Sequence, residues 1–219
     1  MKLKNIKVLL TAGPTHEPID PVRFIGNHSS GKMGYAIAQA ALNAGAKVTL
    51  ISGPVNLSKP SSVDLINVIS AEQMHQQAMI HVKNADVFVA CAAVADYKVA
   101  EVAEQKIKKT ADNQHMQINL IKNPDIVADV AALASKPFTV GFAAETQDVE
   151  QYALGKLKRK NLDLIAANNV AISGQGFNSD KNALTVFSAN KKHEITLSNK
   201  SEVAKQLVVL IANQLDEKN

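Results

Sequence analysis

Three segments near the start of the sequence set the architecture: Ile6-Lys-Val-Leu-Leu10, Gly31-Lys-Met-Gly-Tyr-Ala-Ile-Ala-Gln-Ala-Ala-Leu-Asn43 and Val48-Thr-Leu-Ile51. The first and third are short, nearly continuous apolar runs, which are typical of parallel strands buried on both faces. The middle segment has the length of a helix. A strand, a helix and a second strand in this order predict a right-handed βαβ unit.

The same alternation continues along the chain. Further strands are predicted at residues 65–69, 86–90, 138–142 and 162–166, and further helices at 71–83, 124–134, 148–160 and 201–215. Two late runs, 184–187 and 193–197, predict an antiparallel hairpin. The expected fold class is α/β, with a doubly wound, mostly parallel, Rossmann-like sheet that ends in this hairpin.

Two long irregular stretches, residues 13–30 and 92–113, interrupt the pattern. Both follow predicted strands, so both leave the carboxyl edge of the sheet, where open α/β sheets bind ligands. Loops of this length in a compact fold are usually functional. We find no repeat, low-complexity tract or linker, and we therefore expect residues 1–219 to form a single domain.

Composition narrows the class of protein. Of the 219 residues, 46% are hydrophobic and 20% are charged, which suits a packed core rather than disorder. No apolar run is long enough to predict a transmembrane helix, and the first residues do not resemble a signal peptide. The single cysteine, Cys91, excludes an internal disulfide framework. These features predict a cytoplasmic protein with no membrane partner.

The positive charge is small but clustered. The net charge of +4 includes basic runs at residues 106–109 and 156–160, whereas aromatic residues are only 4% and tryptophan is absent. Few aromatic side chains are left to stack on bases, so this balance favours a small anionic ligand over a nucleic acid. A non-catalytic nucleic-acid module remains an alternative, and it would show steeply salt-dependent binding. The six histidines lack metal-ligand spacing, and no metal ligands are assigned.

The segment Ser29-Ser-Gly31 at a predicted helix start favours an anion, because free backbone N–H groups and the helix dipole point there. A plain N-cap role for serine is the alternative. Residues 26–32 also match the G-x-x-x-x-G-K spacing of a phosphate-binding Walker loop. However, Met33 replaces the Ser/Thr that binds Mg²⁺, and no strand leads into Gly26. We reject that motif and keep the prediction of a phosphate site.

Other candidates lie in the two long loops. Arg23 offers a rigid fork to carboxylate or phosphate, and Asn27 offers both a donor and an acceptor, although either side chain could instead stabilise its own loop. The run Ala90-Cys-Ala-Ala-Val-Ala-Asp96 has small side chains that would let a ligand approach the backbone, with tight helix–sheet packing as the alternative. Cys91 is expected to be buried and inert, because no basic neighbour lowers its pKa.

The predicted helix at residues 148–160 carries lysines along its apolar side. Val149, Tyr152 and Ala153 define that face, and Lys156 and Lys160 fall near its middle. Lysines placed in this way either extend outward to water or meet an anion, and we favour the anion.

Tyr152 and Lys156 also match the YxxxK pair of short-chain dehydrogenases. The glycine-rich turn that those enzymes need after the first strand is absent. A dehydrogenase is therefore the second enzyme hypothesis, and hydride transfer from a nicotinamide cofactor would distinguish it.

Taken together, these segments resemble the phosphopantothenoylcysteine synthetase family over nearly the whole chain. The matching motifs include Thr11-Ala-Gly-Pro-Thr, Asp20-Pro-Val-Arg-Phe-Ile, Asn27-His-Ser-Ser-Gly-Lys-Met-Gly, Ala92-Ala-Val-Ala-Asp-Tyr, Lys106-Ile-Lys-Lys, Asn123-Pro-Asp-Ile-Val, Gly141-Phe-Ala-Ala-Glu-Thr and Gly174-Gln-Gly-Phe-Asn-Ser-Asp-Lys-Asn. So many motifs in order are far more specific than any single one of them.

The resemblance implies a ligase of coenzyme A biosynthesis. In that family CTP activates 4′-phosphopantothenate as an acyl-cytidylate, and cysteine then displaces CMP. The resemblance also implies Mg²⁺ with the nucleotide, a homodimer, and a flavin-dependent decarboxylase that is fused or associated. Eukaryotic members tend to use ATP. The residues of the motifs in this sequence are similar to those of bacterial members, which favours CTP.

The resemblance also implies roles for individual residues. Asn27 and Lys106 would be catalytic, Asn27 by holding the acyl-cytidylate and Lys106 by stabilising charge. The nucleotide would contact Gly13, Ser29, Gly31, Gly34, Ala90, Cys91, Ala92, Asp96, Lys106, Pro124, Asp125, Ile126, Val127, Phe142, Lys156 and Lys160. The phosphopantothenate side would be formed by Arg23, Asn27, Ala92, Ala93 and Asp96, in part from the neighbouring subunit.

Overall fold

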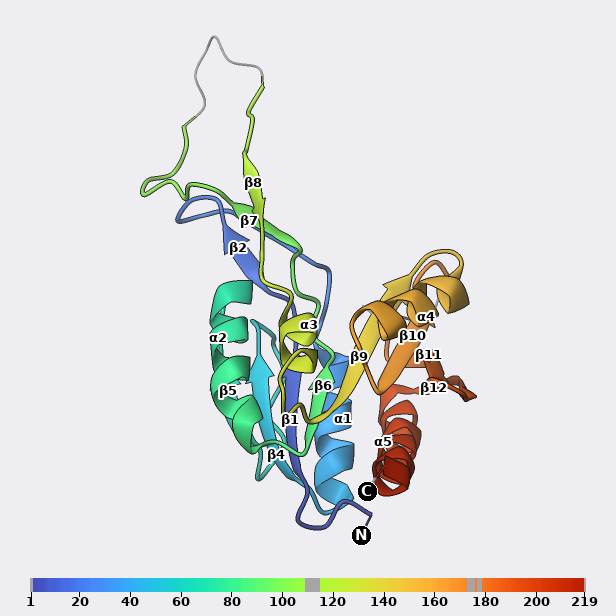
Figure 1. Ribbon diagram of the computed structural model, residues 1–219. Helices are drawn as coiled ribbons and strands as arrows, with labels where there is room; N and C mark the ends of the chain where they lie inside the picture. Colours follow the sequence, from blue (N-terminus) through green and yellow to red (C-terminus); the bar gives the residue numbers. More distant parts are fainter. Residues whose placement is uncertain (1, 109–114, 173–175, 177–178, 219) are drawn as a thin grey trace.

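The computed structural model describes residues 2–108, 115–172, 176 and 179–218 (Figure 1). Its main sheet has the strand order β12-β11-β10-β9-β6-β1-β4-β5. The strands are β1 (Lys7–Ala12), β4 (Lys47–Ser52), β5 (Asp64–Asn67), β6 (Val87–Ala90), β9 (Phe138–Glu145), β10 (Leu164–Asn169), β11 (Lys181–Phe187) and β12 (Lys192–Asn199). Neighbouring strands from β5 to β10 are parallel, and only β11 and β12 pair antiparallel. The predicted fold class, including the late hairpin, is confirmed.

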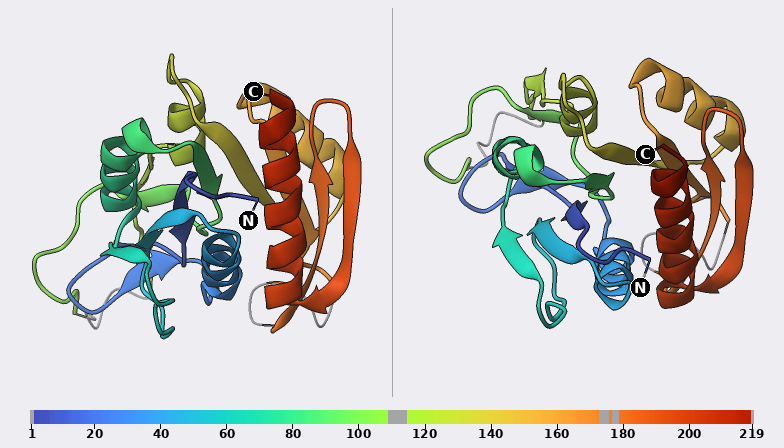
Figure 2. Two further views of the ribbon diagram at one scale, coloured as in Figure 1. Left: turned by 90° about the horizontal axis from the view of Figure 1, so that it is seen from below. Right: turned by 60° about the horizontal axis from the view of Figure 1, so that its bottom comes forward.

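Helices cover both faces of this sheet. One face packs against α1 (Lys32–Asn43) and α5 (Lys200–Lys218), which lie side by side (Figure 2). The other face packs against α2 (Ala71–His81), α3 (Ile126–Ala131) and α4 (Val149–Arg159). Side chains of β1 alternate between the faces, because Val8 and Leu10 join the first core and Leu9 joins the second. Among the described residues, no helix combines the length and the apolar content needed to cross a bilayer.

Short strands appear inside both loops that the sequence left irregular. Strands β2 (His16–Pro18) and β3 (Phe24–Gly26) form a hairpin in the first loop. In the second loop, β7 (Tyr97–Val99) pairs with β8 (Leu120–Lys122), which follows that loop, and this ribbon leads into an arm that extends away from the main sheet (Figure 1). The arm carries Lys106, whereas Lys109 lies outside the described residues. The described parts of these loops therefore extend the carboxyl edge of the sheet.

Two predictions about helices need correction. The helix predicted at 124–134 is shorter, because the Asp125 side chain accepts from the Ala128 N–H and caps α3 at that point. The apolar face of α4 was assigned to Val149, Tyr152 and Ala153, but Tyr152 is 46% exposed. Leu157 is buried with Ala153 instead, since these two residues lie one turn apart on the side that faces the sheet.

Candidate functional site

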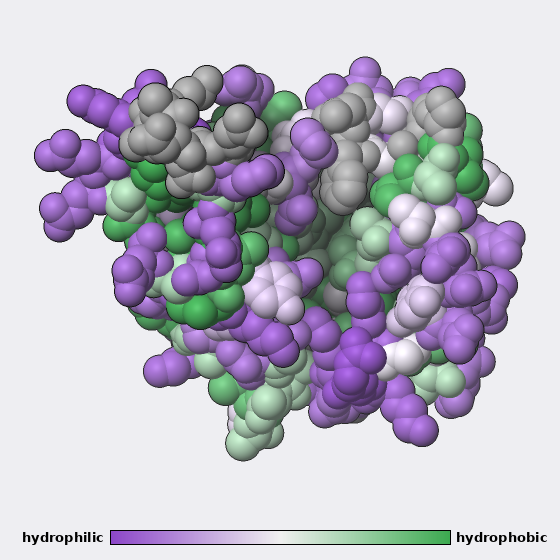
Figure 3. Space-filling model, turned by 90° about the horizontal axis from the view of Figure 1, so that it is seen from above, coloured by the Kyte–Doolittle hydropathy of each residue, from purple (hydrophilic) through white to green (hydrophobic). Residues whose placement is uncertain are grey.

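Two adjoining hollows lie at the carboxyl edge of the parallel strands. The α1 hollow lies between the start of α1, strands β9 to β11 and the start of α5. The α4 hollow lies between β6, the segment that follows it, the start of α3 and the side of α4. They share four lining residues, Ala92, Ala93, Phe142 and Ala144, so they form one cleft. Seen from above, the molecule is hollowed near its centre (Figure 3).

Most of the predicted site residues line this cleft. The α1 hollow contains Ser29, Gly31, Gly34, Cys91, Ala92, Ala93 and Phe142. The α4 hollow contains Asn27, Ala90, Ala92, Ala93, Asp96, Pro124, Asp125, Ile126, Val127, Phe142, Lys156 and Lys160. Gly13 lies just below the cleft, where its carbonyl accepts from the Ala93 N–H at 2.9 Å. The structure thus brings together segments that are more than 100 residues apart in the sequence.

The start of α1 presents its backbone to the α1 hollow. Gly31 occupies the N-cap position with φ of +75° and no side-chain cap, and the Ser29 hydroxyl accepts from the Gly31 N–H at 3.3 Å. A side chain at Gly31 would be strained by this φ, and a Cβ there would lie 2.7 Å from Val55. The serine therefore supports the turn and does not cap the helix. The first turn of α1 lines the hollow, and the free N–H groups at a helix start favour an anion.

Lysines on α4 line the α4 hollow, and carboxylates hold them there. Lys156 Nζ lies 2.7 Å from Glu145 Oε1, and Lys160 Nζ lies 2.7 Å from an Asp125 carboxylate oxygen. Within this chain, Lys156 and Lys160 therefore pair with the carboxylates of Glu145 and Asp125. Because both side chains remain partly exposed, their ammonium groups can also contact an anionic ligand in the hollow.

Amide side chains support the floor of the α4 hollow. Asn27 Nδ2 donates to the Ala93 carbonyl at 3.0 Å, and Asn123 Nδ2 donates to the Ala95 carbonyl at 2.9 Å. Asn123 Oδ1 is buried and has no hydrogen-bond donor among the described residues. These contacts fix the backbone of the segment that follows β6, so that it lines the cleft in one conformation.

Cys91 lines the α1 hollow, but it is not a nucleophile. Burial raises the pKa of its thiol to about 12, and the nearby charge of Lys200 only partly offsets this. The thiolate is therefore scarce at neutral pH. The raised pKa agrees with the prediction that Cys91 is inert, whereas the residue is partly rather than fully buried.

Arg23 and Lys106 lie outside both hollows. The Arg23 guanidinium binds the Asp20 carboxylate and donates to the Ile107 carbonyl at 3.2 Å. The hydrogen bond from Arg23 holds the pKa of Asp20 well below its usual range, and N–H groups of Val22, Ile107 and Arg23 add to this effect. Arg23 thus stabilises its own loop and links it to the arm. Lys106 is exposed on the arm, and its role with the nucleotide stays a prediction.

The structure does not bring Tyr152 and Lys156, the YxxxK pair of short-chain dehydrogenases, into one site. Lys156 lines the α4 hollow, whereas Tyr152 is exposed and lines neither hollow. In the part of the chain that the structure describes, no group of three or more His, Cys, Asp or Glu residues is placed to hold a metal ion. Metal coordination by a dedicated protein cage therefore has no support in these residues.

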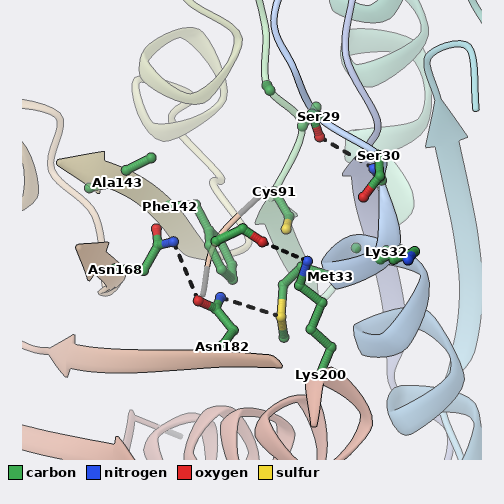
Figure 4. Close-up of a pocket in the computed structure, with 16 residues that line it drawn as sticks. Ser29, Ser30, Lys32, Met33, Cys91, Phe142, Ala143, Asn168, Asn182 and Lys200 are labelled. Carbon is green, nitrogen blue, oxygen red and sulfur yellow. Dashed lines mark hydrogen bonds between the residues drawn. The ribbon is translucent and has the colours of Figure 1, made fainter. Parts of the chain in front are cut away.

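Sequence reasoning missed several polar residues of the cleft: Asn123, Asn168, Asn182 and Lys200. Asn168, Asn182 and Lys200 line the α1 hollow from β10, β11 and α5 (Figure 4), so no spacing in the sequence relates them. One signal was available, since Lys200 stands at the start of a helix, where the dipole disfavours a positive charge.

The comparisons with known proteins agree on one family. The family described as the DNA/pantothenate metabolism flavoprotein C-terminal domain matches residues 3–215. The coenzyme A biosynthesis bifunctional protein CoaBC of Vibrio parahaemolyticus is 58% identical over 203 residues, which cover 92% of this chain and 51% of that protein. The chain thus spans about half the length of the curated relatives that it matches.

Solved structures share the fold. The C-terminal domain of a CoaBC protein superposes with a TM-score of 0.84 at 39% identity, covering 99% of this chain and 98% of that one. A mutant of Cab2 in complex with phosphopantothenate-cysteine superposes with a TM-score of 0.81 at 19% identity, covering 98% of this chain and 89% of that one. The second likeness concerns the fold alone.

Proposed function

Because the chain belongs to the family of DNA/pantothenate metabolism flavoprotein C-terminal domains, we propose that it is a CTP-dependent phosphopantothenate–cysteine ligase. The observation that carries the proposal is the cleft itself. It joins the uncapped start of α1 to a second hollow lined by Lys156 and Lys160. A cleft of this kind suits two phosphorylated substrates that must meet end to end.

The reaction has two steps. The carboxylate of 4′-phosphopantothenate attacks the α-phosphorus of CTP, which forms an acyl-cytidylate and releases pyrophosphate. The amine of cysteine then attacks the acyl carbon, the C–O bond to the cytidylate breaks, and CMP leaves as the amine loses a proton. Activation is needed because a free carboxylate is a poor acyl donor.

The residues of the α4 hollow would act on the nucleotide. Lys156 and Lys160 would exchange part of their contact with Glu145 and Asp125 for the triphosphate, and their charges would stabilise the departing pyrophosphate. The start of α3 adds backbone N–H groups at Ile126 and Val127. Asn27, held by its bond to the Ala93 carbonyl, would orient the acyl-cytidylate.

Mg²⁺ is proposed to arrive with CTP, since it keeps several waters and binds substrate phosphates more readily than a protein cage. Asp96 is an exposed carboxylate in the α4 hollow and is the residue best placed to contact such an ion. When bound, the ion would neutralise charge on the triphosphate.

Two partners are part of the proposal. Exposed apolar side chains on the arm, including Val102, Leu120 and Ile121, support a homodimer in which Arg23 and Lys106 act at the neighbouring subunit's cleft. The relatives are bifunctional, so a fused or associated decarboxylase would consume the product, phosphopantothenoylcysteine. Nucleic acid and membrane are not proposed as partners, and a cytoplasmic location stays a prediction.

The proposal is tested by incubating the protein with 4′-phosphopantothenate, cysteine, Mg²⁺ and each nucleoside triphosphate in turn. Pyrophosphate release that requires both phosphopantothenate and CTP is the expected result. Release with ATP but not CTP would overturn the nucleotide assignment. No release with any nucleotide would overturn the ligase, and hydride transfer with a nicotinamide cofactor would replace it with a dehydrogenase.

A further inference from the structure

A buried carboxylate joins the first long loop to the arm (Figure 1). Asp20 is only 3% exposed, and the N–H groups of Val22 and Arg23 and the Arg23 guanidinium all donate to its side chain from its own loop. A further donor is the Ile107 N–H, which lies on the arm at 3.1 Å from Asp20 Oδ2. Arg23 Nη2 also donates to the Ile107 carbonyl at 3.2 Å. The ion pair of Asp20 and Arg23 therefore binds both polar backbone groups of one arm residue.

A local role explains only part of this arrangement. An aspartate often accepts from N–H groups two and three residues further on and so stabilises a turn, and Asp20 Oδ1 does this with Val22 and Arg23, each at 2.9 Å. A buried carboxylate also needs an opposite charge, which Arg23 supplies from the same loop. The contact with Ile107, 87 residues away in the sequence, adds nothing to that turn. It acts on the arm.

Holding the Ile107 N–H also holds the residue before it. A peptide bond is planar, and the plane that contains the Ile107 N–H contains the Cα of Lys106 as well. The contact between Arg23 and the Ile107 carbonyl fixes the following plane in the same way. In addition, the Ala103 N–H donates to the Ile19 carbonyl at 3.0 Å, so the same loop holds the arm at a second point. The backbone that carries Lys106 is thus fixed, although Lys106 itself is exposed.

Lys106 is the arm residue that would act at the neighbouring subunit's cleft in the proposed reaction. An ammonium group stabilises a transition state only when it is held in place, and a displacement of about 1 Å can slow a reaction by about 100-fold. We propose that Asp20 is a positioning residue of this reaction: together with Arg23 it holds the peptide beside Lys106 and thereby places that lysine. The proposal rests on the ligase function and deepens it, because Asp20 lines neither hollow.

A merely structural role for Asp20 makes a different prediction. If Asp20 only stabilised its own loop, its loss would disturb Asn27, which follows on that loop and lines the cleft of its own chain. The damage would then come on top of any loss at Lys106. If Asp20 acts through Lys106, its loss removes only what Lys106 contributes, and it has no further effect once Lys106 is replaced.

The experiment is a double-mutant cycle of Asp20→Asn and Lys106→Gln, with pyrophosphate release measured in the presence of 4′-phosphopantothenate, cysteine, Mg²⁺ and varied CTP. The asparagine amide has one acceptor oxygen and one donor nitrogen, so it cannot accept on both sides as the carboxylate does. We expect Asp20→Asn to lower kcat by about 10- to 100-fold and to change KM for CTP by less than about threefold. In the Lys106→Gln background, the same substitution should change kcat by less than about twofold.

Asp163→Asn is the matched control. Asp163 is also mostly buried, and it accepts from the Thr139 N–H at 2.8 Å and pairs with Lys218 at 2.6 Å. It immediately precedes β10 and contacts the beginning of β9, so it lies at the edge of the sheet opposite the cleft. The substitution should lower the midpoint of urea unfolding and leave kcat within about twofold in both backgrounds.

Three results would overturn the proposal: equal slowing by Asp20→Asn in both backgrounds, a raised KM for CTP without a lower kcat, or an unchanged kcat. If Asp20→Asn does not fold, Asp20→Glu replaces it, because glutamate keeps the charge for Arg23 but moves the carboxylate by one methylene group. We expect Asp20→Glu to slow turnover by about three- to tenfold, and only while Lys106 is present. No slowing, or slowing that persists in the Lys106→Gln background, would contradict the proposal.

The outcome is separable from that of the ligase proposal. If the wild-type protein releases pyrophosphate and Lys106→Gln matches it, the roles of Lys106 and Asp20 are refuted while the ligase stands. A wild-type protein that releases no pyrophosphate refutes the ligase, on which the role of Asp20 depends.

Discussion

The α1 hollow and the α4 hollow adjoin at one edge of the sheet, but they hold positive charge in different ways. In the α4 hollow, Lys156 and Lys160 are each paired with a carboxylate at 2.7 Å. In the α1 hollow, Lys200 is buried and no acidic residue is among the described lining. Lys156 and Lys160 are thus held by carboxylates and stay partly exposed, whereas the buried Lys200 donates to the Gly176 carbonyl at 2.8 Å. The difference teaches that the lysines of the α4 hollow can exchange one anion for another, whereas Lys200 belongs to the buried framework that joins α5 to the segment before β11.

The largest expected effect comes from Asn27→Asp in the α4 hollow. The change replaces an amide that donates to the Ala93 carbonyl with a carboxylate that repels both this carbonyl and the acyl-cytidylate. We expect ligation to slow by about 100-fold, similar to the loss of a donor that stabilises developing charge. The measurement is the rate of phosphopantothenoylcysteine formation at saturating substrates. Normal turnover would remove Asn27 from the site.

A packing change should disturb the α1 hollow through its helix. A Cβ at Gly34 would lie 2.5 Å from the Ala12 Cβ, so Gly34→Ala must push α1 away from β1. We expect the free energy of unfolding to fall by about 1–3 kcal/mol, as for overpacked cores. Urea unfolding measures the change.

Gly155→Ala is the matched control, because nothing lies within 4 Å of a Cβ at Gly155 on the exposed side of α4. Alanine should stabilise that helix by up to about 1 kcal/mol. Equal effects at Gly34 and Gly155 would mean that α1 does not pack as closely on β1 as described.

Charge removal in the α4 hollow should act on the nucleotide. Lys156→Gln leaves Glu145 without its ion pair and directed at the triphosphate, so we expect KM for CTP to rise by about 10-fold. Lys158→Gln, on the outer side of the same helix, is the control and should leave KM within twofold. Initial rates at varied CTP measure both. Parallel changes in the two variants would show that only the net charge of α4 matters.

The smallest effect on activity is expected at Cys91. With a thiol pKa of about 12, the thiolate fraction at pH 8 is about 10⁻⁴, against about 10⁻¹ in the unfolded chain. Iodoacetamide should therefore label the folded protein at least about 100-fold more slowly than the urea-unfolded protein. Labelling should accelerate as pH rises, and Cys91→Ala should keep full ligase activity. Rapid labelling at pH 8 would contradict the raised pKa of this thiol.

The sequence predicted those parts of the fold that carry a repeating pattern. Strands β1 and β4 were predicted from nearly continuous apolar runs, and α1 from the length of the segment between them. The three-residue strands β2, β3, β7 and β8 are too short to show a period, and they form only because the chain folds back on itself. Tyr152 was assigned to the wrong side of α4, because Leu157 was not weighed when the apolar face was assigned.

The candidate site also divides into residues that the sequence predicted and residues that it missed. Ser29, Gly31, Lys156 and Lys160 were found because they lie in motifs or at helical spacing. Lys200, Asn168 and Asn182 were missed because α5, β10 and β11 meet only in the folded sheet. Lys106 was found as a motif, but its position on the arm places it away from its own chain's cleft, and a sequence does not show which subunit a residue serves.

The central claim is that this cleft joins phosphopantothenate to a nucleotide by activating its carboxylate. The most direct measurement mixes the protein with 4′-phosphopantothenate, CTP and Mg²⁺ in the absence of cysteine and follows a single turnover. We predict one equivalent of pyrophosphate per active site and an acyl-cytidylate that added cysteine converts to CMP and product. Pyrophosphate that forms only after cysteine is added, or not at all, would contradict the account.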